Sequence, residues 1–207
     1  MAFRLFCLIS ALTALFTGCS PQQPDTTRAA GVTRTNTADE PAAKALIKPF
    51  FQRYKGFLQR NYPFRFVIGG LPQKNSFLAL NAPVVAAYVD SVRACGPVSP
   101  AYLNRLQSHF HAVGDQLLRN KQNEGEVAGL DYDAVFLNAD NDDFYATLDT
   151  AQVRLLRAWP GRRLYAVPAG MPLMVQVREL NRQWQLDSID VDTATVYARV
   201  RREMKQR

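Results

Sequence analysis

The sequence has few of the residues that build metal centres and disulfides, because its 207 residues include only two histidines and three cysteines. Two histidines are too few for a multi-histidine metal site, and we expect no bound cofactor. The chain also lacks an apolar run of the roughly 20 residues that a membrane-spanning helix needs. Its twelve prolines and eleven glycines follow no period, which excludes a fibrous repeat.

What the chain does have is enough apolar material for one folded domain. Hydrophobic residues make up 47% of the sequence and aromatic residues 11%, which is typical of a chain that buries a core. The length suits one domain with a tail. The formal net charge is +7.

The first nineteen residues predict export and lipidation. Arg4 precedes a charge-free, mainly apolar stretch over residues 5–16, which is typical of a signal peptide and too short to span a bilayer. The stretch ends in Leu15-Phe16-Thr17-Gly18-Cys19, which resembles the lipobox of bacterial lipoproteins. That resemblance implies cleavage before Cys19 and a diacylglycerol group on its thiol.

A lipid anchor at Cys19 would place the rest of the chain outside the cytosol. We therefore expect a bacterial cell-envelope protein whose partner is the membrane, with Ser20 compatible with the outer membrane as in related lipoproteins. Nucleic acid is not an expected partner in that compartment. Cys7 would leave with the signal peptide, so Cys95 would have no partner for an intramolecular disulfide. The alternative is a cytosolic protein with an apolar N-terminus.

Composition divides the chain into three parts. Residues 1–18 are the expected signal peptide. Residues 19–44 hold three prolines, five threonines and a single large aliphatic residue, so we expect the lipid anchor and a disordered tether there. Residues 45–207 form the expected globular domain.

Hydrophobic residues at helical spacing predict three helices at the start of this domain. The patterns cover residues 46–58, 84–92 and 102–118. Asn81 and Ser99 precede the second and third patterns, where an Asn or Ser side chain commonly caps a helix.

After the third helix the hydrophobic period changes to that of strands. The predicted strands cover residues 151–155, 164–167, 173–177 and 184–189. Asn181-Arg182 is a predicted hairpin turn because Asn tolerates the left-handed conformation. A short final helix begins at Asp192. Helices followed by a meander of strands predict an α+β domain, with three helices packed on an antiparallel sheet.

Two motifs carry a resemblance to known proteins. The last predicted strand, Trp184-x-Leu186-Asp187-x-Ile189, follows helices and strands in an order that resembles the nuclear-transport-factor-two-like, or cystatin-like, fold. Asp131-Tyr132-Asp133, with Phe136 and Asn138-Ala139-Asp140 after it, resembles a motif of uncharacterised bacterial lipoproteins with that fold. The resemblance covers residues 46–191 and implies a cone-shaped domain with a curved sheet. It brings no catalytic residues.

Asp131 and Asp133 form the first candidate site. If both carboxylates faced a pocket, they would provide the pair that general acid/base catalysis requires. The alternative is a structural role in which they accept hydrogen bonds from backbone amides.

A second candidate lies in the acidic segment 123–149, which has eight acidic residues and no Lys or Arg. Oxygen-bearing residues at the first, third, fifth and twelfth positions of a calcium loop would be Asn138, Asp140, Asp142 and Asp149. Asp143 replaces the glycine that such loops have at the sixth position. A calcium site and a solvated acidic loop both remain open, and the second is favoured.

The third candidate is an aromatic pocket. Tyr54, Tyr88, Phe110 and Trp184 would line it if a cavity separated helices from sheet, and would otherwise be core residues. We expect a non-enzymatic envelope lipoprotein that binds a protein, a glycan or a small apolar ligand. The alternatives are an enzyme that uses Asp131 or Asp133 for proton transfer and a calcium-binding module. The sequence has no recognisable nucleophile or phosphate motif, which favours the first function.

Overall fold

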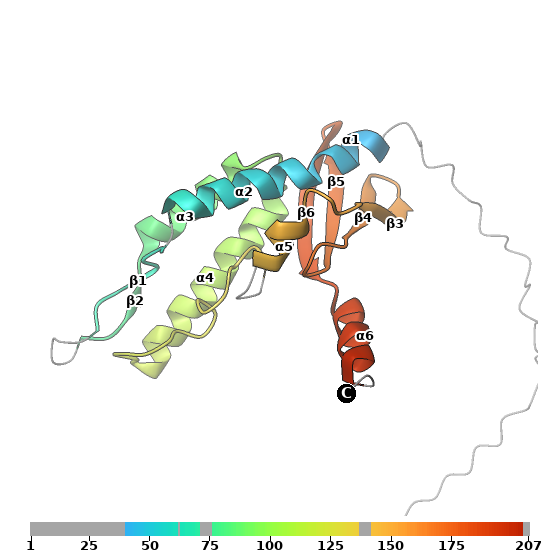
Figure 1. Ribbon diagram of the computed structural model, residues 1–207. Helices are drawn as coiled ribbons and strands as arrows, with labels where there is room; N and C mark the ends of the chain where they lie inside the picture. Colours follow the sequence, from blue (N-terminus) through green and yellow to red (C-terminus); the bar gives the residue numbers. More distant parts are fainter. Residues whose placement is uncertain (1–39, 62, 71–75, 137–141, 205–207) are drawn as a thin grey trace, which may run out of the picture. The chain divides into compact units, whose positions relative to one another are not determined.

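The computed structural model describes residues 40–61, 63–70, 76–136 and 142–204 (Figure 1). The helices in these ranges are α1 (Glu40–Ala45), α2 (Ile47–Asn61), α3 (Ala82–Ala94), α4 (Pro100–Asn120), α5 (Asp142–Thr147) and α6 (Thr193–Met204). The strands are β1 (Val67–Ile68), β2 (Ala79–Leu80), β3 (Arg154–Trp159), β4 (Arg162–Val167), β5 (Leu173–Leu180) and β6 (Gln183–Val191). Cys19 lies outside the described residues.

The prediction of an α+β domain with an antiparallel sheet is confirmed. Strands β3, β4, β5 and β6 form a four-stranded meander in that order, and β1 pairs with β2 in a separate hairpin. The first strand of the meander begins at Arg154 rather than at residue 151. Ala151 instead donates its backbone N–H to the Thr147 carbonyl in a turn after α5, at 3.0 Å.

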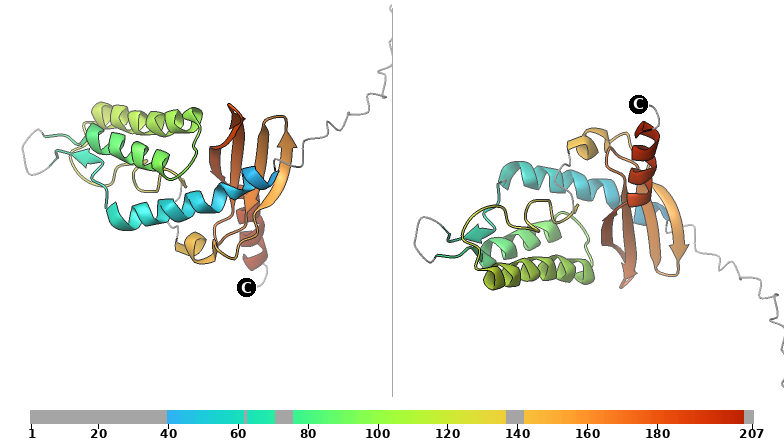
Figure 2. Two further views of the ribbon diagram at one scale, coloured as in Figure 1. Left: turned by 90° about the horizontal axis from the view of Figure 1, so that it is seen from above. Right: turned by 90° about the horizontal axis from the view of Figure 1, so that it is seen from below.

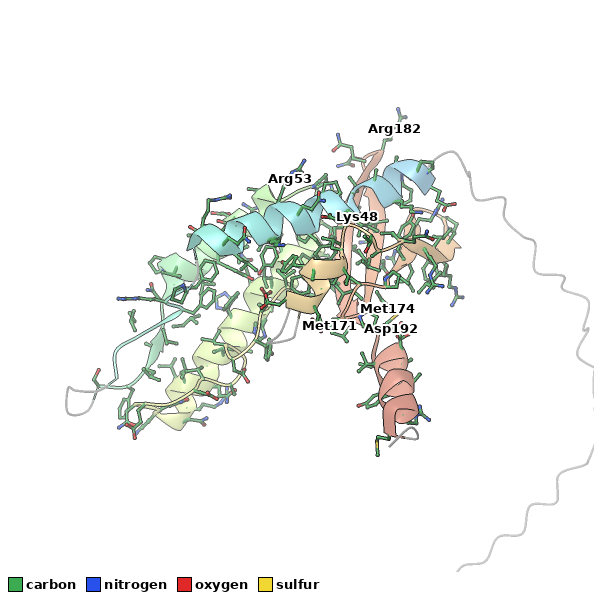
Figure 3. All side chains as sticks on the ribbon, in the orientation of Figure 1. Lys48, Arg53, Met171, Met174, Arg182 and Asp192 are labelled. Carbon is green, nitrogen blue, oxygen red and sulfur yellow. The ribbon has the colours of Figure 1, made fainter. Side chains whose placement is uncertain are left out.

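The predicted turn at Asn181-Arg182 is confirmed by its backbone. Asn181 has φ 51° and Arg182 has φ 62°, and Leu180 pairs with Gln183 across the turn. Positive φ at both central residues is the requirement of the two-residue turn that matches the twist of a hairpin. Arg182 lies at the tip of this hairpin (Figure 3).

We expect Arg182→Gly to raise the free energy of unfolding by about 1 kcal/mol, because glycine adopts positive φ without the steric cost of a Cβ. Arg154→Gly is the matched control, since it removes an exposed arginine from a strand, where glycine lowers stability by about 0.5–1 kcal/mol. Urea unfolding of the full chain measures both. A decrease for Arg182→Gly would contradict the strain argument.

Both predicted residues occupy the N-cap position of their helix, but only Ser99 caps the helix through its side chain. Ser99 Oγ accepts a hydrogen bond from the Tyr102 backbone N–H at 3.1 Å, at the start of α4. The Asn81 side chain makes no cap bond to α3. Its Nδ2 instead donates to the Arg65 carbonyl at 3.2 Å, because the preceding strand β2 lies beside that segment.

The structure contains elements that the sequence patterns do not show. Helix α1 covers the last five residues of the expected tether and Ala45, and its Ala43 is fully buried. The Tyr165 hydroxyl of β4 donates to the Glu40 carbonyl at 3.3 Å, so residues 40–44 belong to the packed part of the chain. Helix α5 and the β1–β2 hairpin are also additional, and elements of two or six residues are too short to display a period.

The main core cluster joins the helices to the sheet, and a smaller cluster of Val113, Leu117 and Val127 lies beside the later part of α4. Helix α1 and the start of α2 lie across the sheet (Figure 2), and Phe51 of α2 packs on Phe136 and Phe144 with ring centroids 5.5 and 4.9 Å away. Helix α3 packs mainly on α4, and α4 also contacts β2 and β6. In the later part of α2, Tyr54 and Phe57 both contact Tyr88 of α3.

A small set of buried polar groups connects α4 to the sheet. Ser99 Oγ donates to Asp187 Oδ1 at 2.6 Å, and Gln176 Nε2 donates to Asp187 Oδ2 at 2.9 Å. The backbone reinforces this link, because Ser99 N–H donates to the Leu186 carbonyl at 2.8 Å.

Within the described ranges, no helix has the length and apolar character needed to cross a bilayer.

Candidate functional site

A pocket of about 490 Å³ opens where the later part of α2 meets α3, α4, α5 and the segment 129–134. Its volume lies in the range of small-molecule sites. The aromatic residues that line it are Tyr54, Phe64, Phe66, Tyr88, Phe110, Tyr132 and Tyr145. The charged residues that line it are Lys55, Asp131, Asp133 and Asp142. No residue of the four-stranded sheet is among the described lining residues, so this pocket lies among helices and the segment 129–134 rather than between helices and the sheet.

Helical periodicity brings the aromatic side chains to this position. Tyr54 of α2, Tyr88 of α3 and Phe110 of α4 are each no more than 3% exposed, and all three line the pocket. Tyr88 packs edge-on against Phe110 with ring centroids 5.6 Å apart. Phe66, from the segment before β1, contacts Phe110 at 5.0 Å and forms another part of the wall.

A glycine directs the acidic segment toward the pocket. Gly129 has φ 89°, and a Cβ at this position would lie 2.9 Å from Val113 Cγ2 of α4. The close approach lets His109 Nε2 hydrogen-bond the Gly129 carbonyl at 2.8 Å. Only glycine combines this backbone conformation with the lack of a side chain. The chain then turns so that Asp131 and Asp133 both line the pocket.

Asp133 is the best-connected polar group of the pocket. Its Oδ1 accepts hydrogen bonds from the backbone N–H groups of Val135 and Phe136, at 2.8 and 3.3 Å. The Tyr54 hydroxyl donates to the same carboxylate and lies 2.9 and 2.8 Å from its two oxygens. Burial raises the pKa of the Asp133 carboxyl, and these three hydrogen bonds oppose the increase.

Two tyrosines extend this hydrogen bond into a chain. The hydroxyl oxygens of Tyr54 and Tyr88 lie 2.6 Å apart. Burial, with the nearby Asp133 carboxylate, raises the pKa of both phenols well above the ordinary value, so both are protonated at neutral pH. Tyr54 donates its single hydroxyl proton to Asp133, so Tyr88 is the donor in the hydrogen bond between the two phenols.

Two further phenols lie within electrostatic influence of Asp133. Burial raises the pKa of Tyr102 and Tyr145, and the Asp133 carboxylate contributes to both increases. Their hydroxyl oxygens are buried and have no hydrogen-bond partner within the part of the chain that the structure describes. Lys55 places its Nζ over the Tyr145 ring, 5.3 Å from the centroid.

The structure brings together some of the candidate residues and separates others. Asp131 lines the same pocket as Asp133 but is exposed, and its Oδ1 accepts the Gly129 N–H at 2.9 Å. Tyr54, Tyr88 and Phe110 meet at the pocket. Trp184 does not line it and lies on β6 instead, with the Arg163 guanidinium 5.1 Å from its ring centroid.

The candidate calcium loop is only partly described. Asn138 and Asp140 lie outside the described residues, and Asp142 is the first residue of α5. Asp149 Oδ1 accepts a hydrogen bond from Gln52 Nε2 of α2 at 2.8 Å. Among the residues with described positions, no group of three or more His, Cys, Asp or Glu could hold a metal ion.

A second hollow, of about 720 Å³, lies between α1, α2 and the start of β3. Its charged lining consists of Lys44, Lys48 and Arg154, and it contains none of the candidate site residues. It is more open than the pocket beside Asp133 and holds no buried titratable group. We therefore take the pocket around Asp133, Tyr54 and Tyr88, which we call the Asp133 pocket, as the candidate site.

Sequence patterns did not identify Lys55 or Tyr145 as pocket residues. Lys55 follows Tyr54 directly on α2, and its position beside the Tyr145 ring depends on α5.

Comparison with models of known families, with curated proteins and with solved structures found no match.

Proposed function

We propose that this chain is a lipid-anchored protein of the bacterial cell envelope whose α+β domain binds a small, largely apolar ligand in the Asp133 pocket. The observation that carries the binding function is the pocket itself, because it combines an aromatic lining with a few polar groups at its wall. Binding sites for small molecules have this composition. No motif for bond-making chemistry was found in the sequence, which favours binding over catalysis.

The proposal includes a cystatin-like fold. Its support is the order of elements, with helices before a four-stranded antiparallel meander. The segment Trp184-x-Leu186-Asp187-x-Ile189 lies within the last strand, β6, as the resemblance implies.

The envelope location rests on the signal-like segment and on Cys19. In a bacterial host, we expect the full chain to incorporate labelled fatty acid and to separate with membranes, and Cys19→Ala to lose the label. Mass spectrometry of the native protein should show a diacylglyceryl cysteine as its first residue. An intact Met1 with an unmodified Cys19 thiol would overturn the location.

Ligand binding is tested by native mass spectrometry of the lipidated protein in detergent. We expect a small molecule to be retained by the wild type and lost from Leu58→Trp, because Leu58 lines the pocket and the larger side chain would fill it. Leu118→Trp is the matched control, since Leu118 is 71% exposed and lies outside the pocket. Equal loss from both variants, or no retained molecule in the wild type, would contradict the proposal.

Proton transfer by Asp133 is a second candidate function. The observation that favours it is a carboxyl whose pKa burial raises, placed at a pocket and hydrogen-bonded to Tyr54. A carboxyl whose pKa lies above the ordinary aspartate value is a stronger base than an ordinary aspartate, which suits a general base or acid. Incubation of the recovered ligand with the full chain tests it. Conversion by the wild type but not by Asp133→Asn would support catalysis, and an unchanged ligand would leave binding as the function.

A further inference from the structure

The charge of the Asp133 pocket differs in sign from that of the whole chain. The chain carries a formal net charge of +7, yet the described residues that line the pocket include three acids, Asp131, Asp133 and Asp142, against one cation, Lys55. Acidic groups at a partly desolvated wall attract a cation more strongly than the same groups in water. The charge distribution therefore favours a positively charged ligand over an anionic one.

The direction of the hydrogen bonds points to the same ligand class. The Tyr54 hydroxyl donates its proton to Asp133, and the Tyr88 hydroxyl therefore donates its proton to Tyr54. The Tyr88 oxygen then keeps acceptor capacity but has no proton to offer. A polar ligand group that reaches Tyr88 or Asp133 must therefore donate hydrogen bonds.

The aromatic wall is also suited to a cation. Lys55 Nζ lies over the Tyr145 ring at 5.3 Å from its centroid, which is within the distance of a cation–π interaction. This wall thus already holds one ammonium group of the chain itself. Organic ammonium ions are bound by aromatic rings in the same way.

From these three observations we propose that the ligand of the Asp133 pocket is an organic amine. Its ammonium group would lie against the Asp131 and Asp133 carboxylates and the Tyr88 oxygen, and its apolar part against Phe66 and Phe110. This inference rests on the proposed binding function and specifies its ligand class.

Three probes of matched size test the ligand class on the full-length protein by isothermal titration calorimetry. They are phenethylammonium, phenethyl alcohol and phenylpropionate, which present a cation, a neutral donor and an anion. We expect phenethylammonium to bind at least about tenfold more tightly than the alcohol, because a cation–π contact and a nearby carboxylate together provide that difference in affinity. We expect phenylpropionate to bind most weakly.

These outcomes separate the inference from the proposed function. Equal affinity for the ammonium and the alcohol would overturn the amine inference. If both probes then bound the wild type but not Leu58→Trp, the result would still support a ligand pocket. Tighter binding of phenylpropionate would also overturn it. Failure of all three probes, together with no retained molecule in native mass spectrometry, would overturn both.

Lys55→Gln provides a second measurement on the same protein. Removing the competing ammonium should tighten phenethylammonium binding about threefold or more, by the Coulomb repulsion that Lys55 exerts at the wall. Lys48→Gln is the matched control on α2, because Lys48 lies outside the pocket and donates to the Asp149 carbonyl. Weaker binding to Lys55→Gln than to Lys48→Gln would contradict the inference.

Discussion

Asp133→Ala is expected to lower the free energy of unfolding by about 3 kcal/mol. The substitution removes the side-chain acceptor of the Val135 N–H and of the Tyr54 hydroxyl, whereas the Phe136 N–H keeps the backbone carbonyl of residue 133 at 3.2 Å. Tyr54 is fully buried, and a buried donor without a partner costs about 1–3 kcal/mol. Urea unfolding of the full chain measures the change.

The control for this variant is Asp131→Ala. Asp131 is exposed and accepts a single backbone hydrogen bond, from Gly129, so its loss should cost no more than about 1 kcal/mol. Equal destabilisation by the two substitutions would show that the Tyr54 hydrogen bond contributes nothing to stability.

The pH dependence of stability should also identify Asp133. Burial raises the pKa of its carboxyl in the folded state, so the folded protein binds more protons here than the unfolded chain does. Stability from this group is therefore fully present below the unfolded carboxyl pKa of about 4 and is lost as pH rises through the folded value. Asp133→Asn retains an acceptor and removes this titration.

The measurement is the free energy of unfolding of the wild type and Asp133→Asn between pH 4 and pH 8. We expect the wild type to lose stability relative to Asp133→Asn as pH rises. A constant difference between the two proteins, or one of opposite sign, would contradict the buried state of the carboxyl.

Asp187→Ala is also expected to lower the free energy of unfolding by about 3 kcal/mol, because it removes the acceptor of two side-chain hydrogen bonds. Asp187 is 7% exposed, and its two oxygens accept from Ser99 and Gln176. Both donors would lose their partner, at about 1–3 kcal/mol each. The backbone carbonyl of Asp187 also accepts from Arg105, a contact that the substitution keeps.

Asp190→Ala serves as the control, since Asp190 is an exposed aspartate of the same strand and surface substitutions change stability by about 0.5 kcal/mol or less. Ser99→Ala should cost about 2 kcal/mol, because it removes the cap of α4 as well as the donor to Asp187. A loss for Asp187→Ala no greater than for Asp190→Ala would show that this link does not hold α4 to the sheet.

The elements that sequence patterns predicted well are those with long or distinctive local signals. In α2, apolar residues recur at helical spacing over several turns, and at the hairpin turn Asn181 is a residue type that tolerates positive φ. Asn81 occupies the N-cap position of α3, but its side chain hydrogen-bonds the Arg65 carbonyl, a tertiary partner, instead of the helix start. Short α1 and α5 gave too few residues for a period.

The candidate site shows the same division. Tyr54, Tyr88 and Phe110 were selected as aromatic residues at helical positions, and Asp133 was selected separately as a carboxylate in an acidic segment. Nothing in the sequence joined these two sets, and Trp184 was indistinguishable from the members that meet. Pocket contacts depend on where each helix crosses its neighbour, which local patterns do not encode.

By itself, the sequence determined the α+β class, the antiparallel meander and the hairpin turn at Asn181-Arg182, because helical period, strand alternation and turn chemistry act between neighbouring residues. Only the tertiary structure decided that the Tyr54 hydroxyl meets both Tyr88, 34 positions away, and Asp133, 79 positions away. Those contacts form because burial of the aromatic faces brings distant segments together, and the buried polar groups must then find hydrogen-bond partners among whatever lies beside them.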